Sequence, residues 1–174
     1  MLLLLTGICL NVSGQDFCSL IKKEVSPDRT IYDFASPYDP AAEPVVRVTR
    51  SYGTNPDYAT DNFFVIFRIT GALESIYKMT DTGEIEIPEH KLVVEFDDQS
   101  KYEDDKIQIS HDFTEDRMNS VRYIFYPLND TTSKEFASKK IVKFSLAGFE
   151  QAVPPDSANA IEHYVQCMRD VKKD

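Results

Sequence analysis

Beyond its first ten residues, the chain has no long run of apolar side chains. No later stretch approaches the roughly 20 consecutive apolar residues of a membrane-spanning helix, so we predict no transmembrane segment in the rest of the chain. Basic residues are also few: 19 Lys and Arg against 29 Asp and Glu give a formal net charge of −10. Phosphate backbones repel so acidic a chain, which argues against a nucleic-acid partner.

The chain also lacks the motifs of common enzymes. There is no nucleophile elbow, phosphate-binding loop or dinucleotide fingerprint. Asp81-Thr82-Gly83 matches the short motif of aspartic proteases, but no second copy supplies the partner carboxylate that this chemistry needs. We interpret it as a hairpin turn.

Metal-binding patterns are absent as well. His90, His111 and His163 are scattered and fit no metal-ligand spacing. The acidic run over residues 97–105 has no central Gly and is interrupted by Lys, unlike a calcium-binding loop, so we expect a solvated loop. We therefore predict no catalytic, metal or cofactor site, and a non-enzymatic protein is favoured.

What the chain does have is an apolar leader. Residues 1–10 carry no charge, and Asn11-Val12-Ser13-Gly14-Gln15 follows with small residues where a signal peptidase would cut. This pattern is typical of a secretory signal, with cleavage expected after Gly14. A lipoprotein reading through Cys9 is disfavoured because the bulky Ile8 precedes it, and a buried N-terminal strand or helix is the other alternative. We expect an exported protein, periplasmic or secreted, with residues 15–174 forming one domain.

Two cysteines remain after the leader, Cys18 and Cys167. Residues 16–25 and 156–171 both show apolar side chains at helical spacing, which predicts an N-terminal and a C-terminal helix. Each Cys lies at the flank of its apolar stripe, so two helices packed side by side could join the sulfurs. An even pair in an exported protein favours a disulfide, and two buried free thiols are the alternative.

Between these ends the apolar period changes from 3.6 to 2. Seven strands are predicted, and several of them alternate an apolar face with a charged one, as antiparallel sheets with one wet face do. Residues 120–126, for example, place Val121, Tyr123 and Phe125 on the apolar face and Arg122 on the charged one. The strands cover residues 45–52, 62–70, 73–79, 91–96, 106–113, 120–126 and 140–146.

The connections are short, which opposes parallel crossovers. The Pro-rich residues 26–44 predict an extended arm with little regular structure, Asn129-Asp130-Thr131-Thr132 a loop, and residues 133–139 one short helical turn. The fold class is therefore mainly β (α+β): an antiparallel β-sandwich, or a curved sheet, of about seven strands with a helix packed at each end.

The leader ending in Ser13-Gly14-Gln15, the early Asp16-Phe17-Cys18 and the segment from Tyr126-Pro127-Leu128 through residues 136–144 resemble small exported proteins of unknown function from Bacteroidetes-type bacteria. The resemblance implies an envelope or secreted β-rich domain. It supplies no catalytic residues.

Three functions remain open from the sequence. The first is a non-enzymatic binding or structural domain of the cell envelope, with a protein, a glycan or a small apolar ligand as partner. The second is a hydrolase of envelope material that uses carboxylates spread across strands, such as Asp112, Glu115 and Asp116. The third is a barrel-like carrier with an apolar cavity lined by Phe63, Phe67, Val94 and Phe96.

Overall fold

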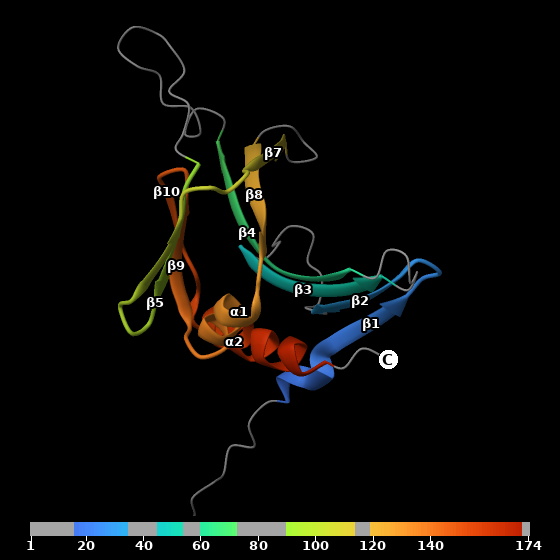
Figure 1. Ribbon diagram of the computed structural model, residues 1–174. Helices are drawn as coiled ribbons and strands as arrows, with labels where there is room; N and C mark the ends of the chain where they lie inside the picture. The colour runs from blue at the N-terminus through green and yellow to red at the C-terminus, as the bar shows by residue number, and fades with distance from the viewer. Residues whose placement is uncertain (1–15, 35–44, 54–59, 73–89, 114–118, 172–174) are drawn as a thin grey trace, which may run out of the picture.

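In a computed structural model, two antiparallel sheets face each other with two helices between them at one end (Figure 1). The structure describes residues 16–34, 45–53, 60–72, 90–113 and 119–171. In chain order the elements are η1 (Phe17–Leu20), β1 (Ile21–Val25), β2 (Arg29–Phe34), β3 (Val46–Gly53), β4 (Asp61–Ala72), β5 (Leu92–Phe96), β6 (Lys101–Asp104), β7 (Ser110–Phe113), β8 (Asn119–Pro127), α1 (Asp130–Phe136), β9 (Ile141–Leu146), β10 (Phe149–Ala152) and α2 (Pro155–Asp170).

One sheet has six strands in the order β1-β2-β3-β4-β8-β7, and the other has four in the order β10-β9-β5-β6. Every pairing is antiparallel. The six-stranded sheet bends, so that β4 and β8 stand upright in Figure 1 while β1 to β3 run across it. The prediction of a mainly β fold with antiparallel sheets and packed helices is confirmed, and the arrangement is a β-sandwich rather than one curved sheet.

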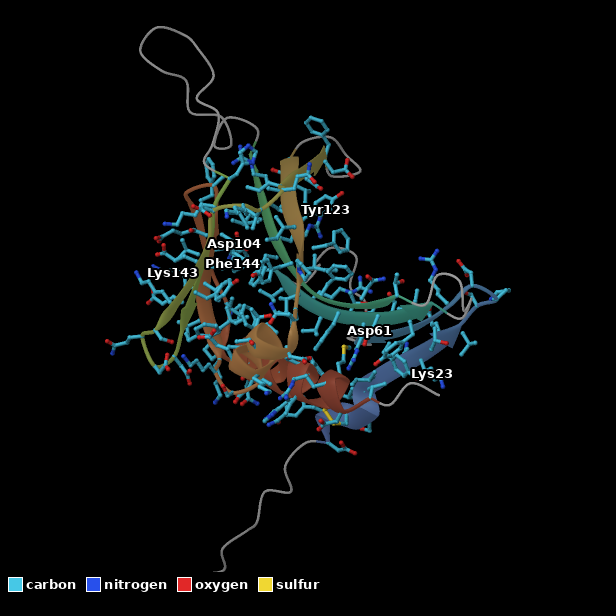
Figure 2. The ribbon with its side chains drawn as sticks, in the orientation of Figure 1. Lys23, Asp61, Asp104, Tyr123, Lys143 and Phe144 are labelled. Carbon is cyan, nitrogen blue, oxygen red and sulfur yellow. A yellow bond between two sulfur atoms is a disulfide. The ribbon has the colours of Figure 1, made fainter. Side chains whose placement is uncertain are left out.

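The core lies between the sheets, where alternate residues of each strand point inward. β5 shows this plainly: Leu92, Val94 and Phe96 are buried, while the side chains between them are half-exposed. Figure 2 shows the same alternation on β9, where Phe144 lies between the sheets and Lys143 points away from them. Phe136 of α1 adds a buried ring that contacts rings from both sheets, those of Phe67, Phe96, Tyr102 and Tyr126.

α2 closes one end of the sandwich, where it packs against η1, α1, β3 and β9. Its buried face repeats at helical spacing and consists of Ala158, Ile161, Tyr164, Val165 and Met168. Cys167 is joined to Cys18 of η1, with Cα atoms 5.4 Å apart and a sequence separation of 149. The predicted pairing therefore links the two ends of the described chain.

The predicted helix over residues 16–25 is wrong beyond its first turn. η1 ends at Leu20, and β1 continues from Ile21 as an edge strand paired with β2. Val25, which the helical spacing placed on a buried face, is 69% exposed. Pairing with β2 satisfies the backbone groups on one side of residues 21–25, and this outweighs a short apolar repeat.

The expected Pro-rich arm is also corrected, because residues 29–34 form β2 between β1 and β3. The remainder of that arm, and the predicted strand over residues 73–79, lie outside the described residues. Two other strands were not predicted, β6 within the acidic run and β10 after β9. In addition, the strand predicted over residues 106–113 is shorter and begins at Ser110.

From Arg122 onward the faces of β8 are the reverse of the prediction, although Val121, predicted on the apolar face, is buried. Arg122, Ile124 and Tyr126 point into the sandwich, whereas Phe125 is 54% exposed. Both sets of alternate residues contain large apolar side chains, so alternation alone does not decide the face. The pairing of Phe67 with Ile124 and of Val65 with Tyr126 decides it, because β4 is anchored in the core.

Candidate functional site

A hollow of about 320 Å³ lies where the end of α2 meets α1 and the paired strands β3 and β4. We call it the charged hollow, because three cations and two carboxylates line it. Its lining is mostly polar, and Phe63 and Leu128 are its apolar members. The lining residues are Arg50, Asp61, Phe63, Leu128, Asn129, Asp130, Ser133, Lys134 and Arg169.

Arg50 of β3 holds one wall of the hollow in place. Its guanidinium donates from Nε to Asp61 Oδ1 at 3.0 Å and from Nη2 to Asp61 Oδ2 at 2.8 Å. Nη1 donates to the carbonyl oxygens of Met168 and Arg169, the latter at 3.2 Å. These carbonyls belong to the last turn of α2 and have no partner within the helix, so Arg50 caps it.

The rings of Tyr52 and Phe63 flank the same guanidinium, with centroids 5.0 and 5.2 Å away. The Tyr52 hydroxyl donates to the carbonyl of Val171 at 3.2 Å, so neighbouring side chains of β3 hold the end of α2 together. The hydrogen bonds to Asp61 raise the pKa of Arg50 above its ordinary value, while partial burial opposes this. The Asp61 carboxylate is thereby engaged in a bidentate pair.

The opposite wall is the first turn of α1, fixed by a capping box. Asn129 Oδ1 accepts from the backbone N–H groups of Thr131 and Thr132 at 2.8 and 2.9 Å, and Thr132 Oγ1 accepts from the Asn129 N–H at 2.9 Å. Phe136, fully buried, anchors the other end of this helix. Asp130 and Lys134, one turn apart, are thus presented at the hollow on a short but fixed element.

Two cations of the hollow differ from Arg50 in that no side chain of the described residues pairs with them. Among the described residues, neither Lys134 nor Arg169 has a side-chain hydrogen bond or an ion pair within 4 Å. Arg169 is half-buried and lies next to Met168, whose side chain is fully buried, while Lys134 is exposed. The hollow therefore offers two positive groups on a fixed frame.

A second surface feature is a row of rings on the outer face of the six-stranded sheet, formed by Phe64, Phe125 and Tyr123. Phe125 meets Phe64 and Tyr123 edge-on, with centroids 6.1 and 5.8 Å apart. In Figure 2, Tyr123 lies on the side of β8 away from the four-stranded sheet. Phe64 and Phe125 form a cross-strand contact between β4 and β8, whereas Tyr123 and Phe125 are neighbours on one face of β8.

Two polar clusters lie between the sheets. The hydroxyls of Tyr102 and Tyr126 share a short hydrogen bond, and the Tyr126 hydroxyl also donates to Asp104 Oδ2 at 3.3 Å. Burial raises the pKa of Tyr126 well above its ordinary value, and the hydrogen bond with Tyr102 adds to this effect. Arg122 is 1% exposed, and its guanidinium stacks over the ring of Phe149 at 4.4 Å. Both clusters link the facing sheets.

The candidates from the sequence are not gathered in one place. Asp112 lies exposed on the edge strand β7, its carboxylate accepting from the backbone N–H of Phe113, whereas Glu115 and Asp116 lie outside the described residues. His90 is exposed, and the ring of His163 packs against Phe17 at 4.6 Å.

His111 lies on β7, and Asp81-Thr82-Gly83 falls outside the described residues. In the part of the chain that the structure describes, no three His, Cys, Asp or Glu side chains form a group that could hold a metal ion. The acidic run is partly held by hydrogen bonds and ion pairs, such as Asp98 with Ser100 and Lys139.

The four residues proposed to line an apolar cavity are instead part of the packed core. Phe63, Phe67, Val94 and Phe96 are all buried and belong to one contiguous cluster. A second, smaller depression of about 40 Å³ lies on the outer face of the four-stranded sheet. Charged residues line it as well, among them Glu95, Lys101, Lys143 and Glu150.

Sequence reasoning missed the charged hollow, because its residues come from distant segments around positions 50, 61, 130 and 169. The predicted loop over residues 129–132 is wrong, because Asn129 caps α1, which begins at Asp130. The capping box is the signal in the sequence that marks this start. No local pattern marks Arg50 or Arg169.

The chain thus forms a disulfide-linked β-sandwich with a polar hollow at the helix end. Comparisons with protein-family models, curated proteins and solved structures find no match to this chain. Among the described helices, none is long and apolar enough to cross a membrane.

Proposed function

We propose that this protein is an exported, non-enzymatic binding domain of the cell envelope, periplasmic or secreted, whose ligand occupies the charged hollow. The observation that carries the proposal is the pair of unengaged cations, Lys134 and Arg169, on a frame that Arg50 and the capping box hold rigid. A preorganised site loses little conformational entropy when it binds. Its volume is at the small end of ligand pockets, which run from about 300 to 1,000 Å³.

The chemistry of the hollow favours binding over catalysis. The Asp61 carboxylate is bound by Arg50, and the Asn129 side chain is committed to the helix cap, so neither is free to move a proton. Among the described residues, the charged groups that remain in the hollow are the two cations and the Asp130 carboxylate, which attract and orient a ligand. Of the partners that the sequence left open, a glycan fragment or another small polar ligand suits this lining better than an apolar one.

Export is supported by the pairing of Cys18 with Cys167, because disulfides persist in oxidising compartments and are rare in the cytosol. The apolar leader agrees with the same compartment. An acidic protein with charged outer faces is also suited to staying dispersed in such a space.

The proposal is tested by blocking the hollow. We expect at least one member of a panel of neutral, acidic and amino sugars and free amino acids to raise the melting temperature of the wild type by several degrees near saturation, because a ligand that binds only the folded state stabilises it. Asp130→Trp places a bulky ring at the rim and should abolish that rise.

The matched control is Asp105→Trp, the same exchange at an exposed position beyond β6, and it should keep the rise. If no compound in the panel stabilises the wild type, or if Asp130→Trp is stabilised as strongly as the wild type, the hollow is not the binding site.

A further inference from the structure

We infer that the charged hollow takes a sugar carrying a carboxylate, with that carboxylate held between Lys134 and Arg169. The inference rests on the proposed function and adds the chemical class of the ligand.

The lining of the hollow carries a net positive charge. Arg50 and Asp61 neutralise each other in a bidentate pair. The charges that remain in the lining are two positive ones, Lys134 and Arg169, and one negative one, Asp130. This local excess of one positive charge lies in a chain whose formal net charge is −10. An anionic ligand group is attracted to the hollow, because cations exceed carboxylates in its lining.

The same count favours a carboxylate over a phosphate. One negative charge balances the local excess, whereas a phosphate dianion would leave a surplus negative charge beside Asp61 and Asp130. A planar guanidinium such as that of Arg169 pairs well with a carboxylate or a phosphate, so the charge count is what distinguishes the two. Asp130, which accepts hydrogen bonds only, then faces ligand hydroxyl groups.

The two cations lie on different elements, α1 and α2, which pack against each other. The carbonyl of Arg169 accepts from Arg50, and its neighbour Met168 is fully buried. Lys134 follows the capping box by one turn on α1, whose last residue, Phe136, is buried in the core. The ligand would therefore bridge α1 and α2.

The test compares three probes that differ at one carbon: D-glucuronate, D-glucose and D-glucose 6-phosphate. Each is titrated into the disulfide-intact protein at constant ionic strength, and backbone amide shifts are followed by NMR. We expect glucuronate to shift amides in residues 129–134 and at Arg169 more strongly than either other probe. The double variant Lys134→Gln/Arg169→Gln should weaken glucuronate binding roughly tenfold or more.

The control variant is Lys101→Gln, which removes an exposed cation on β6 and should leave glucuronate binding unchanged. The amide spectra of both variants, recorded without probe, show that they are folded. Stronger binding of glucose 6-phosphate, or loss of binding in Lys101→Gln as well, overturns the inference.

Equal binding of glucose and glucuronate at the hollow also overturns the carboxylate inference, but it leaves the proposed function standing. Shifts confined to amides elsewhere, or no shifts with any of the three probes, count against the inference. In that case, a compound of the first panel that stabilises the wild type but not Asp130→Trp would show that the hollow binds a ligand of another class. The proposed function would then stand although the carboxylate inference had failed.

Discussion

Arg50 shows how much one side chain can organise in this domain. Its single guanidinium joins β3 to β4 through Asp61, caps α2 through two carbonyls, and packs between two rings. Only Arg offers enough donors in a fixed plane to make these contacts together, and Lys could not replace it.

We predict that Arg50→Met lowers the free energy of unfolding by about 2 kcal/mol, because it leaves Asp61 and the last carbonyls of α2 without their partner. Urea unfolding at pH 7 measures the change. Arg47→Met is the control: Arg47 pairs with Asp33 on an exposed face, so its loss should change stability by less than about 1 kcal/mol. Equal losses in the two variants would refute the role of Arg50 as a clamp.

At the scale of elements, the link between η1 and α2 closes most of the chain. Cys18 and Cys167 enclose a loop of about 150 residues, and the ring of Phe17 packs against Tyr164 beside them. The disulfide therefore restricts the unfolded chain far more than it alters local contacts.

We predict that Cys18→Ser/Cys167→Ser lowers the free energy of unfolding by about 4–5 kcal/mol in the chain-entropy account, less any strain that the bond carries. Denaturant unfolding of the variant and of the oxidised wild type measures it. Wild type with reductant should match the variant, which separates the bond from the serine hydroxyls. Alkylation of both cysteines in native, unreduced protein would show that the bond is absent.

The elements also explain what could be predicted from the sequence. β3, β4, β5 and β9 are buried on one face or both, so apolar spacing marks them. β1 is exposed along nearly its whole length, and β6 alternates exposed with half-buried residues, so little apolar signal remains in either strand. Edge strands owe their place to backbone pairing, which spacing does not report.

The charged hollow could not be predicted for a different reason. Its charged residues are ordinary surface residues within their own segments. They come together only because the bent sheet brings β3 and β4 against the end of α2 (Figure 1). A site of this kind is encoded by the register of distant strands rather than by a motif.

At the scale of the whole molecule, the buried tyrosines make the free energy of unfolding fall as the pH rises through the alkaline range. Tyr126 and Tyr164 lie in the interior, where burial favours the neutral phenol. The pKa of Tyr164 is raised to about 12 by burial, from the ordinary value of 10.0. A group whose pKa is higher in the folded state contributes stability that is complete below the unfolded pKa and is lost as the pH rises through the folded pKa.

The window for Tyr164 therefore runs from pH 10 to about pH 12. We predict that the wild type loses stability between pH 8 and pH 11, and that Tyr164→Phe loses about 1.4 kcal/mol less over the same interval, since Phe has no proton to release. Urea unfolding at the two pH values measures the difference, which is independent of any change that the substitution causes at pH 8. Tyr123→Phe, on the outer face of the sheet, should lose as much stability as the wild type. If Tyr164→Phe loses as much stability as the wild type, the loss between pH 8 and pH 11 comes from other groups. Burial near α2 would then not be what keeps the Tyr164 phenol neutral.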